Sequence, residues 1–496
     1  MLKGFTRSFK ALEILNEDQI EEIHKGTLDV LEETGVRFEH KKALQIFEKA
    51  GCKVDRDNMR VKIPAGLAEE CLRRCPSSFR LKARDVAKDT ICGGNTLFFG
   101  PFPGMHTVDI DTWEPRKPSR KEYYEAVKVL DSLENCSRIG NYMPWFGFKG
   151  VPPVMLITEG LAAQIRNFSK CIYNTGYSKG CDEFNVAIAQ AVGIEIGASL
   201  MSSSPLTFYS DAIDATFRFA QAGLPMGVGG GAIFGGTGPA PIAGSTLTNN
   251  AEILAGVVLI QLIKPGLKTF AANFCFPQNM RGGSPAFGDI AVSLHNTIFC
   301  QTWRKYGIPV FIWSPGPSSS KEIDFQCGYE KAIMVLIAAL SGANHISFLG
   351  GISSELTSHP LQAILDNDIG GMIGRFLQGV EISDETLALD LIQQVGPIPG
   401  FYLDKEHTRK WWQREQFVPK CADRLTIPEW LTMGKRNALS YAKERMQEIL
   451  ATHKTKALTP SQDEEVERIL KEAREYYKKK GLISDEEWAD YMKVIK

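Results

Sequence analysis

The chain has 496 residues, 44% of them hydrophobic, so it can bury a large core and form more than one domain. Its 57 basic and 58 acidic residues give a net charge of −1, which argues against a nucleic-acid or acidic-membrane partner. No run approaches the roughly 18 uninterrupted apolar residues of a membrane span, and eleven scattered cysteines favour reduced thiols in a cytoplasmic protein.

The first 90 residues predict a helical N-terminal cap. Helices are expected over 15–34, 40–50 and 67–74, because apolar residues recur at three- and four-residue steps and a glycine or a proline follows each run. No chemical motif occurs in this region, so residues 1–90 are interpreted as a cap or docking domain.

From residue 95 the pattern alternates between short apolar strands and helices. Eight such units in about 280 residues match the (β/α)8 TIM barrel in number and length. An open doubly wound sheet is the alternative, but eight consecutive units without a clear reversal favour closure over residues 91–400. The expected strands are 97–100, 138–143, 170–175, 206–209, 226–229, 268–274, 309–313 and 345–349.

The clearest unit runs from Gly244 to Phe276, where one helical apolar face is followed by Pro265-Gly266 and then by a buried strand. The glycine-rich run 227–231 before it fits a loose dinucleotide fingerprint, but no helix begins directly behind it. A tight loop over the barrel mouth is favoured over a phosphate site there.

Beyond residue 400 the chain is rich in charged and aromatic residues and predicts a helical C-terminal extension over 401–496. Helices are expected over 427–451, 460–478 and 484–494. The Trp411-Trp412 pair indicates packing of a helix onto its domain rather than ligand binding.

Aromatic residues follow most of the predicted strands. In a barrel of this kind the site lies at the carboxyl ends of the strands, and rings there suit a quaternary ammonium, which they attract by ~0.5–2 kcal/mol each. Flat apolar ligands are the competing explanation, and a single aromatic residue at a strand end usually belongs to the core. The aromatic candidates for substrate binding are Phe99, Tyr142, Trp145, Tyr173, Tyr209, Phe274, Trp313 and Phe348.

Three basic residues are candidates to hold an anionic group of the substrate. Arg281 and Lys321 follow the sixth and seventh predicted strands, and His359 lies at the start of the last barrel helix. The motifs HExxH, CxxC and GxSxG do not occur, so we assign no metal site and leave the catalytic residues unknown.

Several stretches resemble the trimethylamine methyltransferase family, in particular its members without pyrrolysine, whose best-known activity is glycine betaine:corrinoid methyl transfer. They extend from about residue 20 to about residue 345, so the resemblance covers the N-terminal region and most of the predicted barrel. The stretches are Ile23–Val36, Cys75–Phe79, Ala83–Asp85, Phe99–Pro101, Asn250–Gly256, Pro265–Gly266, Met280–Gly283, Gln326–Lys331 and Leu340–Asn344.

The resemblance implies a TIM barrel that moves a methyl group from an amine to the Co(I) centre of a separate corrinoid protein. It also implies an anaerobic, cytoplasmic setting, no tightly bound cofactor and a cognate corrinoid protein as partner; we also expect a homo-oligomer. Family members that use trimethylamine carry pyrrolysine, whereas this sequence contains only the twenty standard residues. That difference points to a quaternary amine, with glycine betaine as the first expectation.

Other substrates and one other class of function stay open. Proline betaine, carnitine, butyrobetaine and trimethylamine are alternatives for the same reaction, because one extra methylene in a pocket changes affinity by only ~1–3 kcal/mol. A non-catalytic betaine-binding barrel is the alternative of another class, since a fold does not determine a function.

Overall fold

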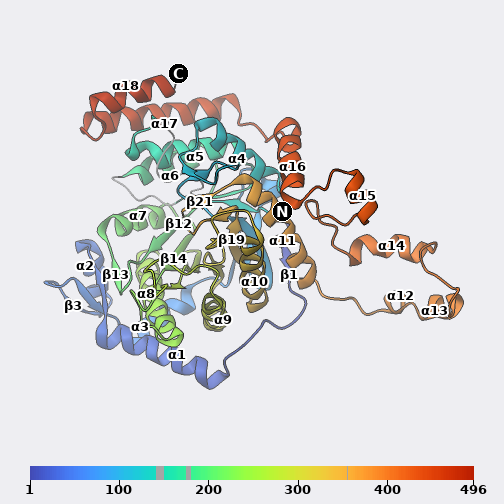
Figure 1. Cartoon of the computed structure of the whole chain (residues 1–496). Coiled ribbons are helices and arrows are strands. Elements are labelled where there is room, and N and C mark those ends of the chain that lie inside the picture. Colours follow the sequence, from blue (N-terminus) through green and yellow to red (C-terminus); the bar gives the residue numbers. More distant parts are fainter. Residues whose placement is uncertain (141–149, 175–179, 355, 496) are drawn as a thin grey trace.

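The computed structural model describes residues 1–140, 150–174, 180–354 and 356–495. Its centre is a curled, mixed nine-stranded sheet in which eight strands run parallel and β1 runs antiparallel (Figure 1). In sheet order the strands are β1 (Phe5–Thr6), β7 (Thr96–Pro101), β19 (His345–Leu349), β18 (Val310–Ile312), β16 (Thr269–Asn273), β14 (Met226–Gly230), β12 (Ile196–Met201), β11 (Cys171–Tyr173) and β10 (Arg138–Ile139).

The first and last strands of the parallel run lie next to each other. Phe99 of β7 and Cys136, just before β10, form a parallel bridge, and the amide of Ser137 donates to the carbonyl of Phe99 at 2.8 Å. β1 pairs with the amino-terminal half of β7. The sheet therefore curls far enough to bring its two ends into contact.

One helix follows each parallel strand in the chain, as the alternating pattern predicts for an α/β fold. Seven of the eight predicted strands overlap a strand of the parallel run. The helices, in chain order, are α4 (Arg120–Ser132), α5 (Leu156–Asn167), α6 (Cys181–Val192), α7 (Ser210–Gln221), α8 (Ile242–Ile263), α9 (Ile290–Lys305), α10 (Phe325–Ser341) and α11 (Pro360–Leu377).

The fourth strand is where the sequence prediction is wrong. The parallel strand is β12, in a stretch where no strand was expected, and Gly193 at φ +78° ends α6 before it. Residues 206–209 instead contain β13 (Thr207–Phe208), which pairs with the N-terminal sheet. Both runs are short and apolar, and periodicity alone does not separate such a strand from a buried helical segment.

The N-terminal region contains a small sheet as well as helices. Its helices α1 (Glu17–Asp29), α2 (Lys41–Lys49) and α3 (Ala65–Arg74) agree with the predicted ones and pack against α8. Its four-stranded sheet has the order β13, β2 (Val36–Phe38), β4 (Arg60–Lys62) and β3 (Lys53–Asp55), in which β4 is an inner strand.

α8 is long and apolar enough to cross a membrane by length and composition alone, with a mean hydropathy of 1.4 over its most apolar window. In the fold, 78% of that window is buried inside the protein. The helix packs closely on β14, because a Cβ atom added at Gly256 would lie 2.5 Å from a methyl group of Val228. Such burial is typical of a core helix.

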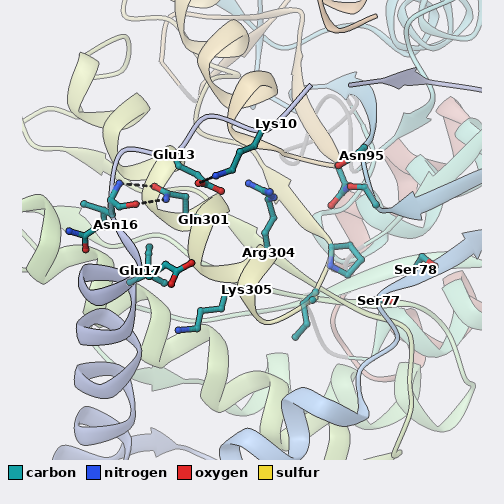
Figure 2. Close-up of a pocket in the computed structure, with 17 residues that line it drawn as sticks. Lys10, Glu13, Asn16, Glu17, Ser77, Ser78, Asn95, Gln301, Arg304 and Lys305 are labelled. Carbon is teal, nitrogen blue, oxygen red and sulfur yellow. Dashed lines mark hydrogen bonds and ion pairs between the residues drawn. The ribbon is translucent and has the colours of Figure 1, made fainter. Parts of the chain in front are cut away.

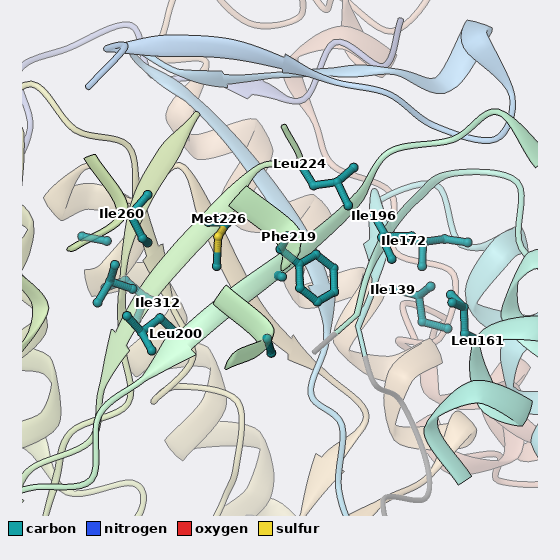
Figure 3. Packing of buried hydrophobic residues seen from close by; sticks show 14 of the residues in the cluster. Ile139, Leu161, Ile172, Ile196, Leu200, Phe219, Leu224, Met226, Ile260 and Ile312 are labelled. Atoms are coloured by element: carbon teal, nitrogen blue, oxygen red, sulfur yellow. The ribbon is translucent and has the colours of Figure 1, made fainter. Parts of the chain in front are cut away.

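The main core lies between the sheet and its surrounding helices. Alternate strand residues point outward into this layer, as Ile196 and Leu200 of β12 and Ile312 of β18 do (Figure 3). On the helix side, Leu161 of α5, Phe219 of α7 and Ile260 of α8 fill the same layer.

The region after α11 is helical, and part of it packs on the helices that surround the sheet. α17 lies over α5 and α6 (Figure 1), where the guanidinium of Arg474 pairs with the buried carboxylate of Glu159 at 2.7 Å. The helices after α11 are α12 (Asp384–Leu387) and α13 (Leu389–Val395), which precede residue 401, and then α14 (Glu406–Glu415), α15 (Ile427–Thr432), α16 (Ala438–Thr452), α17 (Pro460–Lys479) and α18 (Asp485–Val494).

Candidate active site

Aromatic rings gather on the concave face of the sheet, separate from the main core. The Phe270 and Phe311 rings stack with their centroids 3.9 Å apart, and Tyr173 lies 6.4 Å from Trp313 in an edge-to-face arrangement. Glycines of β14 make room for them, because a Cβ atom at Gly227 would lie 2.3 Å from the Phe270 ring. The glycine-rich run is thus part of the sheet itself and lets large rings occupy its concave face.

A second aromatic group lies just beyond the carboxyl ends of β7 and β16. The Phe274 ring lies 5.8 Å from Phe102, 5.4 Å from Phe276 and 5.9 Å from Phe287 between centroids. Phe274 and Trp313 are half-buried, whereas Phe276 and Phe287 are buried. Three predicted substrate residues, Tyr173, Phe274 and Trp313, therefore belong to the concave face or its carboxyl-terminal rim.

Phe99 and Phe348 lie on the opposite face of the sheet. Their ring centroids are 5.3 Å apart, and both rings pack against Gly370 of α11. Neighbouring residues of a strand alternate between faces, so Phe98 and not Phe99 points to the concave side. The structure brings these two predicted residues together with each other but not with Tyr173 and Trp313.

The remaining aromatic candidates have other positions. Tyr209 precedes the first residue of α7 and is 52% exposed, because its segment pairs with the N-terminal sheet and not with the parallel run. Tyr142 and Trp145 lie outside the described residues.

The three basic candidates do not converge on the concave face. Arg281 is exposed in the turn after β17 (Phe276–Pro277), and the exposed Lys321 donates to the carbonyl of Ser319 at 2.5 Å. His359 begins α11, where its Nδ1 atom accepts the amide of Leu361 at 3.1 Å and burial lowers its pKa to about 4. His359 is therefore neutral at pH 7 and caps a helix.

Sequence reasoning missed a cation that does lie on the concave face. Arg138, the first residue of β10, is 7% exposed, and its guanidinium carbon lies 4.7 Å from the Tyr173 ring centroid and 4.5 Å from that of Phe311. The alternation of β10 could have indicated this orientation. Ile139 belongs to the core outside the sheet, so the adjacent Arg138 points to the concave face.

The sequence matches the model of the trimethylamine methyltransferase (MTTB) family over residues 1–145 and 188–476. The chain belongs to this family. Among its relatives, the glycine betaine methyltransferase of Desulfitobacterium hafniense strain Y51 is 30% identical over 467 residues, which cover 92% of this chain and 96% of that protein. The trimethylamine methyltransferase MttB of Methanosarcina barkeri strain Fusaro is 27% identical and covers 89% of this chain and 91% of its own length.

Among solved structures, the monomethylamine methyltransferase MtmB of Methanosarcina barkeri is similar to this family member in fold. The TM-score is 0.51 at 14% sequence identity, with 88% of this chain and 89% of that chain covered. Within the described part of the chain, no group of three or more His, Cys, Asp or Glu side chains could hold a metal ion.

In this trimethylamine methyltransferase family member, two buried acids hold the loops at the carboxyl ends of β18 and β19. Glu330 of α10 accepts the Ser318 hydroxyl at 2.7 Å and the Ser319 amide at 2.8 Å. Asp366 of α11 accepts the Gly350 amide at 2.7 Å and pairs with Lys331 at 2.7 Å. These contacts shape the rim of the candidate site from behind.

A buried polar network lies behind β16, and sequence reasoning missed it too. The Oδ1 atom of Asn273 accepts from Asn249 at 3.0 Å and contacts Nε2 of His295 at 3.1 Å. An amide oxygen only accepts, so Nε2 carries the proton, while Nδ1 lies 2.8 Å from the Thr246 hydroxyl. The network fixes α8 and α9 to β16, which ends at Asn273 directly before Phe274.

A hollow of about 990 Å³ lies at the other end of the sheet, beside the amino ends of β7, β18 and β19. Figure 2 shows its charged lining, with Arg304 projecting between Asn95 and Gln301. Lys10 pairs with Glu13 at 2.6 Å on its wall. Because ligands of parallel α/β sheets bind at the carboxyl ends of the strands and this hollow lies at the opposite end, we assign no reaction to it.

Proposed function

We propose that this protein transfers a methyl group from a quaternary amine, with glycine betaine as the first candidate, to the Co(I) centre of a cognate corrinoid protein. The observation that supports it is the pair Tyr173 and Trp313 on the concave face, in a chain 30% identical to a glycine betaine methyltransferase. Ring faces attract a cation that has no hydrogen to donate. They also offer no nucleophile that would compete for the methyl group.

The reaction needs little from the protein beyond placement. The C–N bond breaks and its electron pair stays on nitrogen, which leaves as a neutral tertiary amine. The electron pair of Co(I) forms the new bond to carbon, so the acceptor becomes methyl-Co(III). Holding the cation, directing one methyl group toward the acceptor and excluding water are the tasks of the site.

The architecture in this proposal is a closed (β/α)8 barrel over residues 91–400, between an N-terminal region and a C-terminal extension. The bridge between Phe99 and Cys136 supports closure, because it joins the two ends of the parallel run. We further propose that the protein acts in an anaerobic cytoplasm and holds no tightly bound cofactor, the corrinoid being bound by its partner.

The test is the visible absorbance of a Co(I) corrinoid protein mixed with this protein and one amine at a time. We expect conversion to methyl-Co(III) with glycine betaine, or with proline betaine, carnitine or butyrobetaine. Conversion with trimethylamine alone would contradict a quaternary substrate. Tight betaine binding without methyl transfer, even with the cognate partner, would favour a binding protein.

Trp313→Ala is expected to lower kcat/KM for the betaine by about 3- to 30-fold, because it removes one cation–π contact of ~0.5–2 kcal/mol. Trp313→Phe keeps a ring face and should retain most of the activity. Phe348→Leu is the matched control, since Phe348 faces α11. Equal losses in the Trp313→Ala and Phe348→Leu variants would argue against a cation site at Trp313.

We also propose that the protein is a homo-oligomer that associates through the segment 378–410, here called the arm. The arm extends away from the rest of the chain (Figure 1), and none of its residues is buried. It nevertheless exposes a row of apolar side chains, and such patches mark interaction sites. They are Val380, Ile382, Leu389, Ile398, Phe401 and Leu403, each 59–95% exposed.

Light scattering after size exclusion tests this proposal. The wild-type protein should give a multiple of 55.0 kDa, and the double variant Ile398→Asp/Leu403→Asp should shift the mass toward one chain, because charges are costly inside an apolar interface. Val86→Asp, at a residue 67% exposed elsewhere, is the control. A wild-type protein of one chain at micromolar concentration would overturn the arm proposal.

A further inference from the structure

Arg138 is a buried cation, and the part of the chain that the structure describes places no anion beside it. Among the described residues, no carboxylate lies within ion-pair distance of its guanidinium, and its side chain donates no hydrogen bond. Its contacts are the ring faces of Tyr173 and Phe311. By contrast, the buried Arg474 pairs with Glu159 and with Glu467, each at 2.7 Å.

The groups around Arg138 do not neutralise it. Burial lowers the pKa of Arg138 to about 10, so it stays protonated at pH 7. The groups that interact with it electrostatically include the Tyr173 phenol, the thiols of Cys92, Cys136 and Cys171, and the His345 ring. Burial raises the pKa of the Cys136 and Cys171 thiols to about 11, and that of Cys92 further.

His345 adds a polar group to this face but no negative charge. Burial lowers its pKa well below the usual range, so the ring is neutral at pH 7. Its Nε2 atom and the Oγ atom of Ser199 are both buried and have no hydrogen-bond partner among the described residues. Among the described residues, the concave face therefore carries one positive charge with no acid beside it and two polar atoms that can still form hydrogen bonds.

An isolated buried charge is strongly unfavourable unless it is paired and hydrogen-bonded. Two ring faces attract a guanidinium, but they accept none of its five N–H donors as a carboxylate does. An anion with oxygen acceptors that reaches the concave face would supply the partner that the described residues do not provide. A carboxylate matches a guanidinium in a bidentate geometry.

We propose that Arg138 binds the carboxylate of the substrate and restricts this enzyme to betaines that carry one. This inference rests on the proposed function and specifies the substrate class for the same site. Choline, tetramethylammonium and trimethylamine lack the group that Arg138 requires.

The placement of Arg138 agrees with the direction of methyl transfer. Tyr173 contacts both Arg138 and Trp313, so the cation site and the carboxylate site are neighbours. The corrinoid approaches from the carboxyl ends of the strands, and the methyl group must face it. The carboxylate then points inward to Arg138, whereas Arg281 and Lys321 are exposed on the loops.

Calorimetry with the purified protein tests the inference without the corrinoid partner. Wild-type protein should bind glycine betaine at least about 30-fold more tightly than its methyl ester, which has the same cation but no negative charge. Arg138→Met should lose this preference and bind both ligands weakly, while Arg138→Lys should restore part of it. Arg304→Met, at the amino ends of the strands, is the matched control and should bind as the wild type does.

Each outcome decides the question. Equal affinity of the wild-type protein for glycine betaine and for its ester overturns the inference, even if Arg138→Met fails to fold. An unchanged preference in a folded Arg138→Met protein overturns it as well. If the preference for the carboxylate is present but no betaine methylates the Co(I) partner, the proposed reaction fails and the role of Arg138 in binding stands.

Discussion

Lys331→Met is expected to lower the free energy of unfolding by about 3–5 kcal/mol, because it leaves a buried carboxylate without its cation. The Lys331 and Asp366 side chains are both 0% exposed and lie 2.7 Å apart. The ammonium also donates to the carbonyls of Phe348 and Gly351, each at 2.7 Å. One substitution thus removes an ion pair and two hydrogen bonds that hold the loop after β19.

The double variant Lys331→Met/Asp366→Leu separates the unpaired charge from the lost packing. Replacing both partners by apolar residues should recover most of the stability, since a buried pair contributes little beyond its apolar equivalent. Lys420→Met is the control, because its pair with Glu134 is about half exposed and surface pairs contribute ~0–1 kcal/mol. Urea unfolding followed by far-UV circular dichroism gives the values, and a Lys331→Met loss below 1 kcal/mol would contradict the prediction.

The repeating pattern of strands and helices could be predicted because it is local. The helix and strand of the stretch 244–276 are found as α8 and β16, since a strong apolar face and a Pro-Gly stop depend on few distant contacts. The prediction of the fourth strand was wrong because β12 and β13 are both short and apolar, and only the strands with which they pair distinguish them. The assignment of Tyr209 to a strand end failed with it.

The candidate site was predictable only down to the level of the loops. A strand end identifies the loop near the mouth, but the face that each side chain occupies depends on the phase of the alternation. Phe348 and Trp313 were therefore equivalent in the sequence, although the first packs on α11 and the second lies on the concave face.

Arg138 was not predicted as a site residue because it is the first residue of its strand, whereas the expected site residues follow the carboxyl ends of strands. Strands of a curled sheet are staggered, and the bridge between Phe99 and Cys136 places the start of β10 level with the carboxyl end of β7. The alternation of β10 indicates that Arg138 faces inward, but no local pattern shows how far along the sheet it lies, since the stagger depends on pairing with other strands.

His295 is expected to make the protein sensitive to acid. Burial lowers its pKa to about 3 in the folded state, while an unfolded chain has a histidine pKa of about 6.5. As the pH falls below about 6.5, His295 binds a proton in the unfolded state but stays neutral in the folded state. The stability conferred by this neutral histidine is therefore present above pH 6.5 and is lost progressively as the pH falls toward 3, by roughly 3 kcal/mol at pH 4.

The comparison of His295→Gln with the wild type isolates this effect from the other buried histidines, His345 and His359. At pH 7 the variant should be less stable, because glutamine cannot reach both Asn273 and Thr246 as the ring does. Urea unfolding at a series of pH values should show this deficit shrink by roughly 3 kcal/mol between pH 6.5 and pH 4, since only the wild type carries the proton penalty. His407→Gln, in the exposed helix α14, should leave the pH dependence unchanged. A His295→Gln deficit that stays constant across the pH range would contradict the prediction, because it would show that the folded protein binds the His295 proton as readily as the unfolded chain does.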